Sequence, residues 1–169
     1  MKKYVFLSVL VFTLSMRAQN TIEDIQKEID NTVWKPFQKA FQTLDGDALN
    51  ALYATDVLRV TPNGIDTQNS FKATNAERFS ANRKNGESIG LDWWWDDRKT
   101  TEDTSYEVGF YRIAFTTAQG KTQYSYGQFH IVVKKIAGHW KITQDWDTAV
   151  IAGKKIDSAL FEQKPSLKF

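Results

Sequence analysis

The chain has 169 residues, with 22 Lys or Arg, 20 Asp or Glu and a formal net charge of +2. It contains no cysteine, which excludes disulfides, thiolate metal sites and cysteine nucleophiles. The balanced charge lacks the basic footprint of a nucleic-acid-binding protein, so we expect no nucleic-acid partner.

The first 18 residues have the order of a secretory signal peptide. Lys2 and Lys3 form a short basic start, an almost unbroken apolar run covers Tyr4–Leu14, and small residues precede a cleavage position after Ala18. We therefore expect a secreted or periplasmic protein. The apolar run is too short to span a membrane and no comparable run follows it, so the mature chain is expected to have no membrane span.

Apolar residues recur at spacings of three and four from Ile22 to Leu44, which predicts an amphipathic helix laid on a core. Pro36 should bend this helix or mark a restart near Asn31. The sequence Asp45-Gly46-Asp47 is typical of the end of one helix followed by the N-cap of the next. It predicts a second, short helix over 48–54.

The middle of the chain predicts one strand over 57–61 and a third helix from about residue 70 to 85, whose solvent face would carry Arg78, Arg83 and Lys84. From Ser88 onward, aromatic and β-branched residues predict strands separated by short turns. The four candidates cover 88–98, 106–117, 122–135 and 140–151. Helices first and an antiparallel meander afterwards indicate one α+β domain. We place it at 19–152, with a short C-terminal helix or tail at 153–169.

Two segments resemble the nuclear-transport-factor-2-like superfamily: VWKPFQKAFQTLDGDALNALYATDVLRVTPNG and GQFHIVVKKIAGHWKITQDWDT. The similarity is to SnoaL-like and ketosteroid-isomerase-like bacterial members, including exported domains of unknown function, and covers roughly 22–152. It implies a conical, curved antiparallel sheet wrapped around a long N-terminal helix, a cystatin-like α+β barrel, with a pocket inside and often a dimer through the outer sheet face. This fold carries enzymes, binding modules and dimerisation domains alike.

The hairpin turns predict the strand register without the resemblance. A turn at 137–138 places His130 opposite Asp145, and a turn at 119–120 places it opposite Gly109. Alternation then gathers one set of residues on a single face: Tyr111, Ile113, Tyr126, Gln128, His130, Val132, Asp145 and Asp147. Matching the strands to the steroid isomerase pattern implies that this face lines the pocket.

A histidine that faces an aspartate on an enclosed surface is how a protein orients a base. We therefore predict His130, Asp145 and Asp147 as catalytic residues, with Asp145 orienting the imidazole. The alternative is that these buried polar groups pair only to satisfy each other. The remaining pocket residues are predicted as Trp34, Phe37, Tyr53, Arg59, Trp94, Tyr111, Ile113, Tyr126, Gln128 and Val132. We expect no metal and no cofactor.

The catalytic residues of the family's enzymes have few counterparts in this sequence. By resemblance, the steroid isomerase base falls on Thr61, which has no carboxylate, its tyrosine donor on Phe37 and its protonated acid near His130. The resemblance therefore does not imply a working ketosteroid isomerase. SnoaL-like cyclases place an acid late in the last strand, in a sequence that Trp146-Asp147 resembles, so Asp147 is the strongest carry-over.

The stretch LDWWWDDR, 91–98, places three tryptophans in a row, which no strand can turn to one face. We expect Trp94 to point inward beside Tyr111, and the flanking rings to point outward. The outward set would form an apolar patch that favours a homodimer through the outer sheet face: Trp93, Trp95, Phe110 and Trp146.

Three functions follow from these patterns. The first is an exported domain that binds a small apolar or aromatic molecule in an enclosed aromatic pocket. The second is a SnoaL-like lyase, isomerase or hydrolase that uses His130 and Asp147 as acid and base. The third is a dimeric interaction module with a vestigial pocket.

Overall fold

The computed structural model of the protein describes residues 21–168, so the predicted signal peptide lies outside the described residues. The chain begins with three consecutive helical segments, α1 (Ile22–Ile29), the π-helical η1 (Asp30–Trp34) and α2 (Lys35–Thr43). The π-helical segment ends two residues before Pro36, where a bend or restart is predicted, because proline cannot donate the backbone hydrogen bond that a continuous α-helix needs. Leu44 ends α2 in the left-handed conformation, and α3 (Gly46–Ala51) follows.

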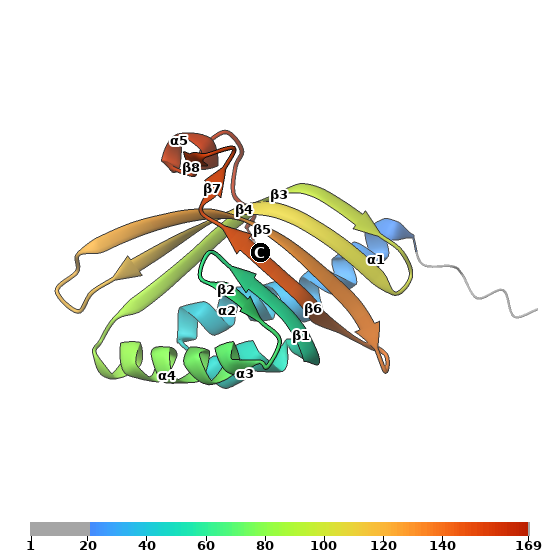
Figure 1. Cartoon of the computed structure of the whole chain (residues 1–169), viewed down its shortest axis with the longest axis horizontal. Coiled ribbons are helices and arrows are strands. Elements are labelled where there is room, and N and C mark those ends of the chain that lie inside the picture. The colour runs from blue at the N-terminus through green and yellow to red at the C-terminus, as the bar shows by residue number, and fades with distance from the viewer. Residues whose placement is uncertain (1–20, 169) are drawn as a thin grey trace, which may run out of the picture.

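Six strands form one curved sheet in the order β2-β1-β6-β5-β4-β3. Their bounds are β1 (Tyr53–Thr61), β2 (Gly64–Asp66), β3 (Ser88–Thr100), β4 (Thr104–Thr116), β5 (Thr122–Ile136) and β6 (His139–Thr148). The helix α4 (Ser70–Lys84) connects β2 to β3. Figure 1 shows the sheet arching over α2, α3 and α4, which confirms the predicted α+β class.

The sheet is mixed, whereas the expected sheet was antiparallel. β3, β4, β5 and β6 form the predicted antiparallel meander, but β1 runs parallel to β6. The reason is that β1 is joined to the meander through β2 and α4 instead of a hairpin.

The β5–β6 register is correct at the turn and wrong beyond it. Residues 137 and 138 both have positive φ, as the predicted two-residue turn requires. A bulge then leaves Thr143 without a partner in the ladder. As a result His130 lies opposite Trp146 instead of Asp145.

The β4–β5 register is also shifted by one residue. A longer loop over 117–121 replaces the predicted two-residue turn, and His130 lies opposite Val108 instead of Gly109. A shift of one residue moves every side chain of a strand to the other face of the sheet. Both shifts involve β5, so the side chains of β5 lie on the opposite faces of the sheet from those predicted.

The assignment of the three tryptophans is reversed as well. Trp93 pairs with Tyr111 and belongs to the main core, together with the adjacent ring of Trp95. Trp95 packs edge-on against Trp34, with ring centroids 5.0 Å apart. Trp93 and Trp95 therefore lie on the side of the sheet that faces the helices.

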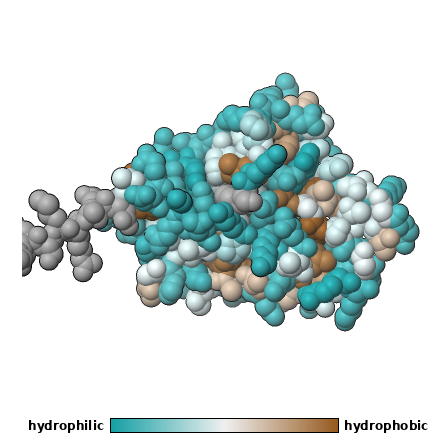
Figure 2. All heavy atoms as spheres, turned by 180° about the vertical axis from the view of Figure 1, so that it is seen from behind, coloured by the Kyte–Doolittle hydropathy of each residue, from teal (hydrophilic) through white to brown (hydrophobic). Residues whose placement is uncertain are grey.

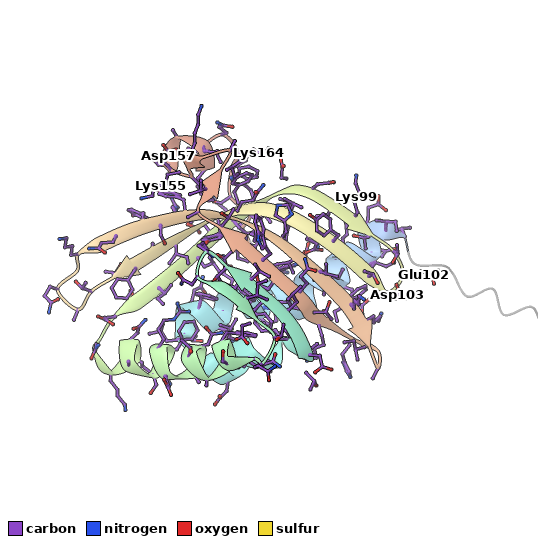
Figure 3. All side chains as sticks on the ribbon, in the orientation of Figure 1. Lys99, Glu102, Asp103, Lys155, Asp157 and Lys164 are labelled. Carbon is purple, nitrogen blue, oxygen red and sulfur yellow. The ribbon has the colours of Figure 1, made fainter. Side chains whose placement is uncertain are left out.

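Trp94 points to the outer side of the sheet, where the C-terminal segment covers it. This segment, residues 149–168, contains β7 (Val150–Ile151), β8 (Lys154–Lys155) and α5 (Ser158–Phe161). The Trp94 Nε1 donates to the Phe161 carbonyl at 2.8 Å, and the ring packs on Phe110. Figure 3 shows the labelled charged residues of this segment, Lys155, Asp157 and Lys164, on the side of the sheet away from α4.

The apolar patch predicted for a homodimer does not form. Trp93 and Trp95 point inward, Phe110 is buried beneath the C-terminal segment, and Trp146 packs edge-on against His130 with centroids 4.7 Å apart. On the face shown in Figure 2, hydrophobic atoms appear in small areas separated by hydrophilic ones. The prediction of a dimer through these four residues therefore loses its basis.

Candidate functional site

A cavity of about 680 Å³ lies between the inner side of the sheet and the helices. Aromatic rings from seven elements line much of it, and charged side chains of β1 and β6 also line it. The aromatic residues are Trp34, Phe37, Phe41, Tyr53, Phe71, Trp93, Tyr111 and Phe129.

The charged groups form a cluster around Arg59. Because β1 and β6 are parallel neighbours, Arg59 lies beside Asp145 in the ladder. Its Nη1 is 2.9 Å from Asp145 Oδ1, and its Nη2 forms an ion pair with Asp147 Oδ2. The hydroxyl of Tyr53 donates to the second oxygen of Asp145 at 2.7 Å. Both oxygens of Asp145 are thus occupied, and the side chain is buried.

Burial dominates the electrostatics of this cluster. It raises the pKa of the Asp145 carboxyl, although the Arg59 charge and the Tyr53 hydrogen bond oppose the shift. Burial and the neighbouring Asp145 charge also raise the pKa of Tyr53. Burial lowers the pKa of Arg59, but the two carboxylates outweigh it and the net shift is upward, so this guanidinium is always charged.

On β4 and β6, two polar groups remain available to a ligand. Among residues 21–168, the Tyr111 hydroxyl has no hydrogen-bond partner, and burial raises its pKa, so it is a neutral donor. Asp147 uses only Oδ2 for Arg59 and receives no hydrogen bond at Oδ1 within the described part of the chain. Both residues line the cavity, so β4 supplies one neutral donor to it and β6 supplies one acceptor.

Most residues predicted on the helices, β1, β4 and β6 do line the cavity, whereas those predicted on β5 do not. Lining residues are Trp34, Phe37, Tyr53, Arg59, Tyr111, Ile113, Asp145 and Asp147. Tyr126, Gln128, His130 and Val132 face outward because of the two register shifts, and Trp94 lies beneath the C-terminal segment. Phe129 and Ile131 take the inward places on β5.

His130 is therefore separated from the two aspartates by the sheet. Its Nδ1 is hydrogen-bonded to the Tyr106 hydroxyl, its ring contacts Trp146, and burial lowers its pKa. The predicted pairing of His130 with Asp145 is wrong, and Asp145 instead pairs with Arg59 and Tyr53.

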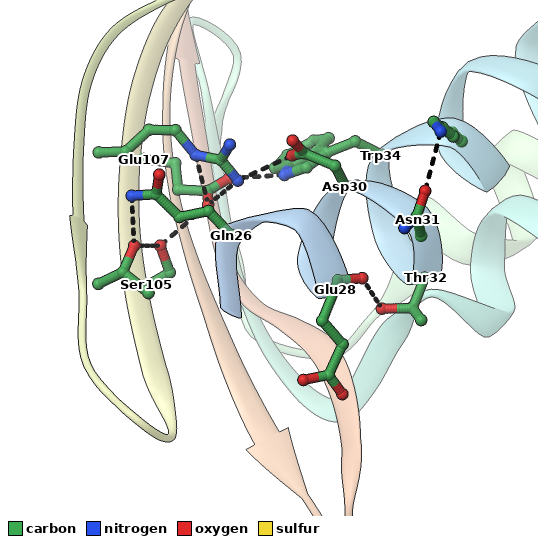
Figure 4. A network of polar contacts seen from close by, with 11 residues as sticks. Gln26, Glu28, Asp30, Asn31, Thr32, Trp34, Ser105 and Glu107 are labelled. Atoms are coloured by element: carbon green, nitrogen blue, oxygen red, sulfur yellow. Dashed lines mark hydrogen bonds and ion pairs between the residues drawn. The ribbon is translucent and has the colours of Figure 1, made fainter. Parts of the chain in front are cut away.

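A second buried network holds Trp34 in the cavity wall (Figure 4). The Trp34 Nε1 donates to Glu107 Oε2 at 2.6 Å, while Arg98 and Ser105 donate to Oε1. Arg98 also pairs with Asp30 at 2.9 Å. Burial raises the pKa of Glu107, and its hydrogen-bond donors oppose that shift. The network fixes the ring of Trp34 because both ends of the carboxylate are bound.

Sequence reasoning missed Glu107, although a signal was present. It lies four residues before Tyr111 on the same strand, so alternation places both on the inner face. The cavity position of Arg78 was also missed: Arg78 is exposed, as its predicted place on the solvent face requires, but it also lines the cavity together with Ser70 and Thr74. Their spacing of four residues is the corresponding signal.

Across residues 21–168, no three His, Asp or Glu side chains are grouped as a metal ion would require. None of the helices in this range is long and apolar enough to cross a membrane.

Comparisons with known proteins give likenesses in structure alone. No family model matches the sequence. A search of curated proteins also finds no match. A conserved protein from Planctomyces limnophilus has a TM-score of 0.63 at 19% identity, over 75% of this chain and 96% of that one. A nuclear transport factor 2-like superfamily protein from Salmonella enterica has a TM-score of 0.57 at 14% identity, over 75% and 92%.

A ketosteroid isomerase-like protein from Erwinia carotovora is also similar, with a TM-score of 0.53 at 17% identity, over 72% of this chain and 93% of that chain. Identities this low carry the fold and not the activity. Together with the curved six-stranded sheet and its helices, these likenesses show that the chain has the nuclear-transport-factor-2-like fold.

Proposed function

We propose that this chain is an exported domain that binds a small, largely apolar or aromatic molecule in the cavity. The observation that carries the proposal is an aromatic cavity of about 680 Å³ with a few polar groups directed into it. Small-molecule sites have this composition and a size of about 300–1,000 Å³. The export part rests on the signal-peptide pattern of residues 1–18.

The arrangement suggests how such a molecule would be held. Its rings or alkyl groups would pack against Trp93, Phe129 and their neighbours, which removes apolar surface from water. The hydroxyl of Tyr111 would donate a hydrogen bond, and Asp147 Oδ1 would accept one. Arg59, Tyr53 and Asp145 would keep the polar side rigid, because each already binds another member of the cluster.

Native mass spectrometry of the purified protein, combined with fluorescence titration of aromatic probes, tests this proposal. We expect bound small molecules or saturable quenching of the tryptophan emission. Tyr111→Phe should weaken binding of a hydrogen-bonding probe by several-fold, since it removes one hydrogen bond. Tyr124→Phe is the matched control because Tyr124 is 57% exposed and outside the cavity lining. Absence of any bound molecule and of any saturable quenching would refute the proposal.

A second candidate is an enzyme that moves a proton with Asp147. It is favoured by the free oxygen of Asp147 and the neutral Tyr111 hydroxyl, which supply an acceptor and a donor to the same cavity. One structural neighbour is called ketosteroid isomerase-like. Thr61 occupies the place implied for the isomerase base; it lines the cavity but cannot act as a carboxylate base.

Asp147→Asn distinguishes the two functions. If Asp147 is the proton acceptor, the variant should lose turnover of a substrate while still binding it. Asp97→Asn, on an exposed carboxylate outside the cavity lining, is the control. Equal turnover by Asp147→Asn and the unaltered protein would exclude the enzymatic role of Asp147 and leave the binding function intact.

A further inference from the structure

The cavity has two chemically different walls. The sheet side contributes rings and aliphatic groups such as Trp93 and Ile113, with the charged Arg59 cluster confined to β1 and β6. The opposite side is a face of α4, where Ser70, Thr74 and Arg78 follow one another at intervals of one helical turn. The helix therefore presents hydroxyl groups and one guanidinium to the cavity.

The two guanidiniums of the cavity differ in their partners. Arg59 is neutralised by its two carboxylates, so it has no free charge for a ligand. Arg78 forms no ion pair within residues 21–168. Its Nη2 is 3.4 Å from Asn75 Oδ1, and its guanidinium carbon lies 5.2 Å from the Phe79 ring centroid. The charge of Arg78 is thus balanced by weak contacts only.

Arg78 is an exposed residue, so its guanidinium stays charged. Partial withdrawal from water and the nearby charge of Arg59 lower its pKa without removing that charge. An anion in the cavity can therefore gain a charge-assisted, bidentate contact with Arg78.

Asp66 also lines the cavity but is already occupied. Its carboxylate accepts hydrogen bonds from the Ser70 hydroxyl and from the backbone of Phe71 and Gln68, at the start of α4. These bonds lower the pKa of Asp66 to about 2. Arg78 lies eight residues beyond Ser70, which is about 12 Å along a helix, so the two charges are held apart.

We infer that the ligand of this cavity is an amphipathic acid, whose apolar body packs on the sheet wall and whose carboxylate or similar anionic group pairs with Arg78. Asn75, which lines the same wall, has a second amide hydrogen that would be donated to another oxygen atom of the anion. The inference rests on the proposed small-molecule function and specifies its ligand class.

Isothermal titration calorimetry with matched probes tests it. The probes are a set of aromatic carboxylic acids with one to three rings, such as naphthalene-1-acetic acid, each compared with its primary amide. We expect at least one acid to bind about tenfold more tightly than its amide, since one charged contact is at stake. Arg78→Gln should abolish this difference by weakening the acid alone, and Arg78→Lys should keep most of it.

Lys84→Gln is the matched control, because it removes the same charge from the same helix outside the cavity lining. Urea unfolding of each variant shows whether it is folded. If acids and amides bind equally, or if Arg78→Gln weakens both by the same factor, the anionic ligand is excluded and the apolar pocket stands. If no probe of either kind binds, both the ligand class and the binding function are refuted.

Discussion

Replacing Arg59 with methionine tests the charged cluster directly. The variant keeps an unbranched, shorter side chain but removes the ion pair with Asp145 and the contact with Asp147. Asp147 keeps access to water, with 18% of its side chain exposed, whereas Asp145 is only 7% exposed. The energetic consequence should therefore come mainly from Asp145, which retains the Tyr53 hydroxyl as its single side-chain donor.

The size of the effect follows from this burial. Removal of one partner of a buried ion pair typically costs about 3–5 kcal/mol, because the other charge is left without compensation. We expect a loss in that range for Arg59→Met in the free energy of unfolding at neutral pH. The exposed pair of Lys99 and Asp97 is the control, with side chains 76% and 49% exposed. Lys99→Met should change stability by less than about 1 kcal/mol.

The direction in which the free energy of unfolding changes with pH identifies Asp145 as the cause of the stability loss. Its folded pKa is already raised by burial, so the folded state binds more protons than the unfolded state between the two pKa values. Stability therefore falls as pH rises through this window. Arg59 opposes the shift, so Arg59→Met should raise the folded pKa further and extend the window upward. The stability deficit of the variant should be largest at neutral pH and shrink as Asp145 becomes protonated.

Urea unfolding followed by tryptophan fluorescence, at about pH 7 and about pH 4, measures both quantities. The double variant Arg59→Met with Asp145→Asn should recover part of the loss at neutral pH, since it no longer buries an unpaired charge. A deficit below about 1 kcal/mol, or one that does not change with pH, would refute the reasoning that Asp145 is buried and compensated by Arg59.

Three further predictions concern the cavity walls and the C-terminal segment. Gly127→Ala should weaken probe binding and cost about 1–3 kcal/mol, because its Cβ would lie 2.4 Å from the Tyr111 hydroxyl and push that ring aside; titration and urea unfolding measure this. Glu107→Ala should cost about 3–5 kcal/mol in urea unfolding, since it leaves the buried Trp34 Nε1 without its acceptor and removes one of the two carboxylates that pair with Arg98. Deleting 157–169 should expose Trp94, shift the emission to longer wavelength and increase binding of an apolar dye.

The fold was predictable because its signals are long and repeat locally. Three of these signals do not depend on contacts between distant segments. They are the spacing of apolar residues in the first helices, the helix end at Asp45-Gly46-Asp47 and the series of strands rich in aromatic residues. Pro36 indicates an interruption of the first helix but not its π-helical form. The parallel pairing of β1 with β6 depends on contacts between distant segments, so the local sequence gives it a weak signal.

The residues of the candidate site were predictable only where the alternation of side chains along a single strand determines which face they occupy. Alternation alone places Tyr111 with Ile113, and Asp145 with Asp147, and all four line the cavity. His130 required two hairpin registers to be correct, and a bulge at Thr143 and a loop of unexpected length moved both. Neither irregularity has a strong local sequence signature, so errors of one residue are to be expected for such strands.

The one-residue shift of β5 also helps to form the candidate site. It places Gly127, instead of Gln128, opposite Tyr111, and Phe129 opposite Asp147. Any side chain at Gly127 would overlap the Tyr111 ring, so only glycine lets this ring lie across β5. Tyr111 and Asp147 line the same cavity, where burial and the Asp147 charge raise the pKa of Tyr111. The register that removes His130 from the cavity is thus the one that leaves a phenol donor on β4 and a carboxylate on β6 facing the same cavity.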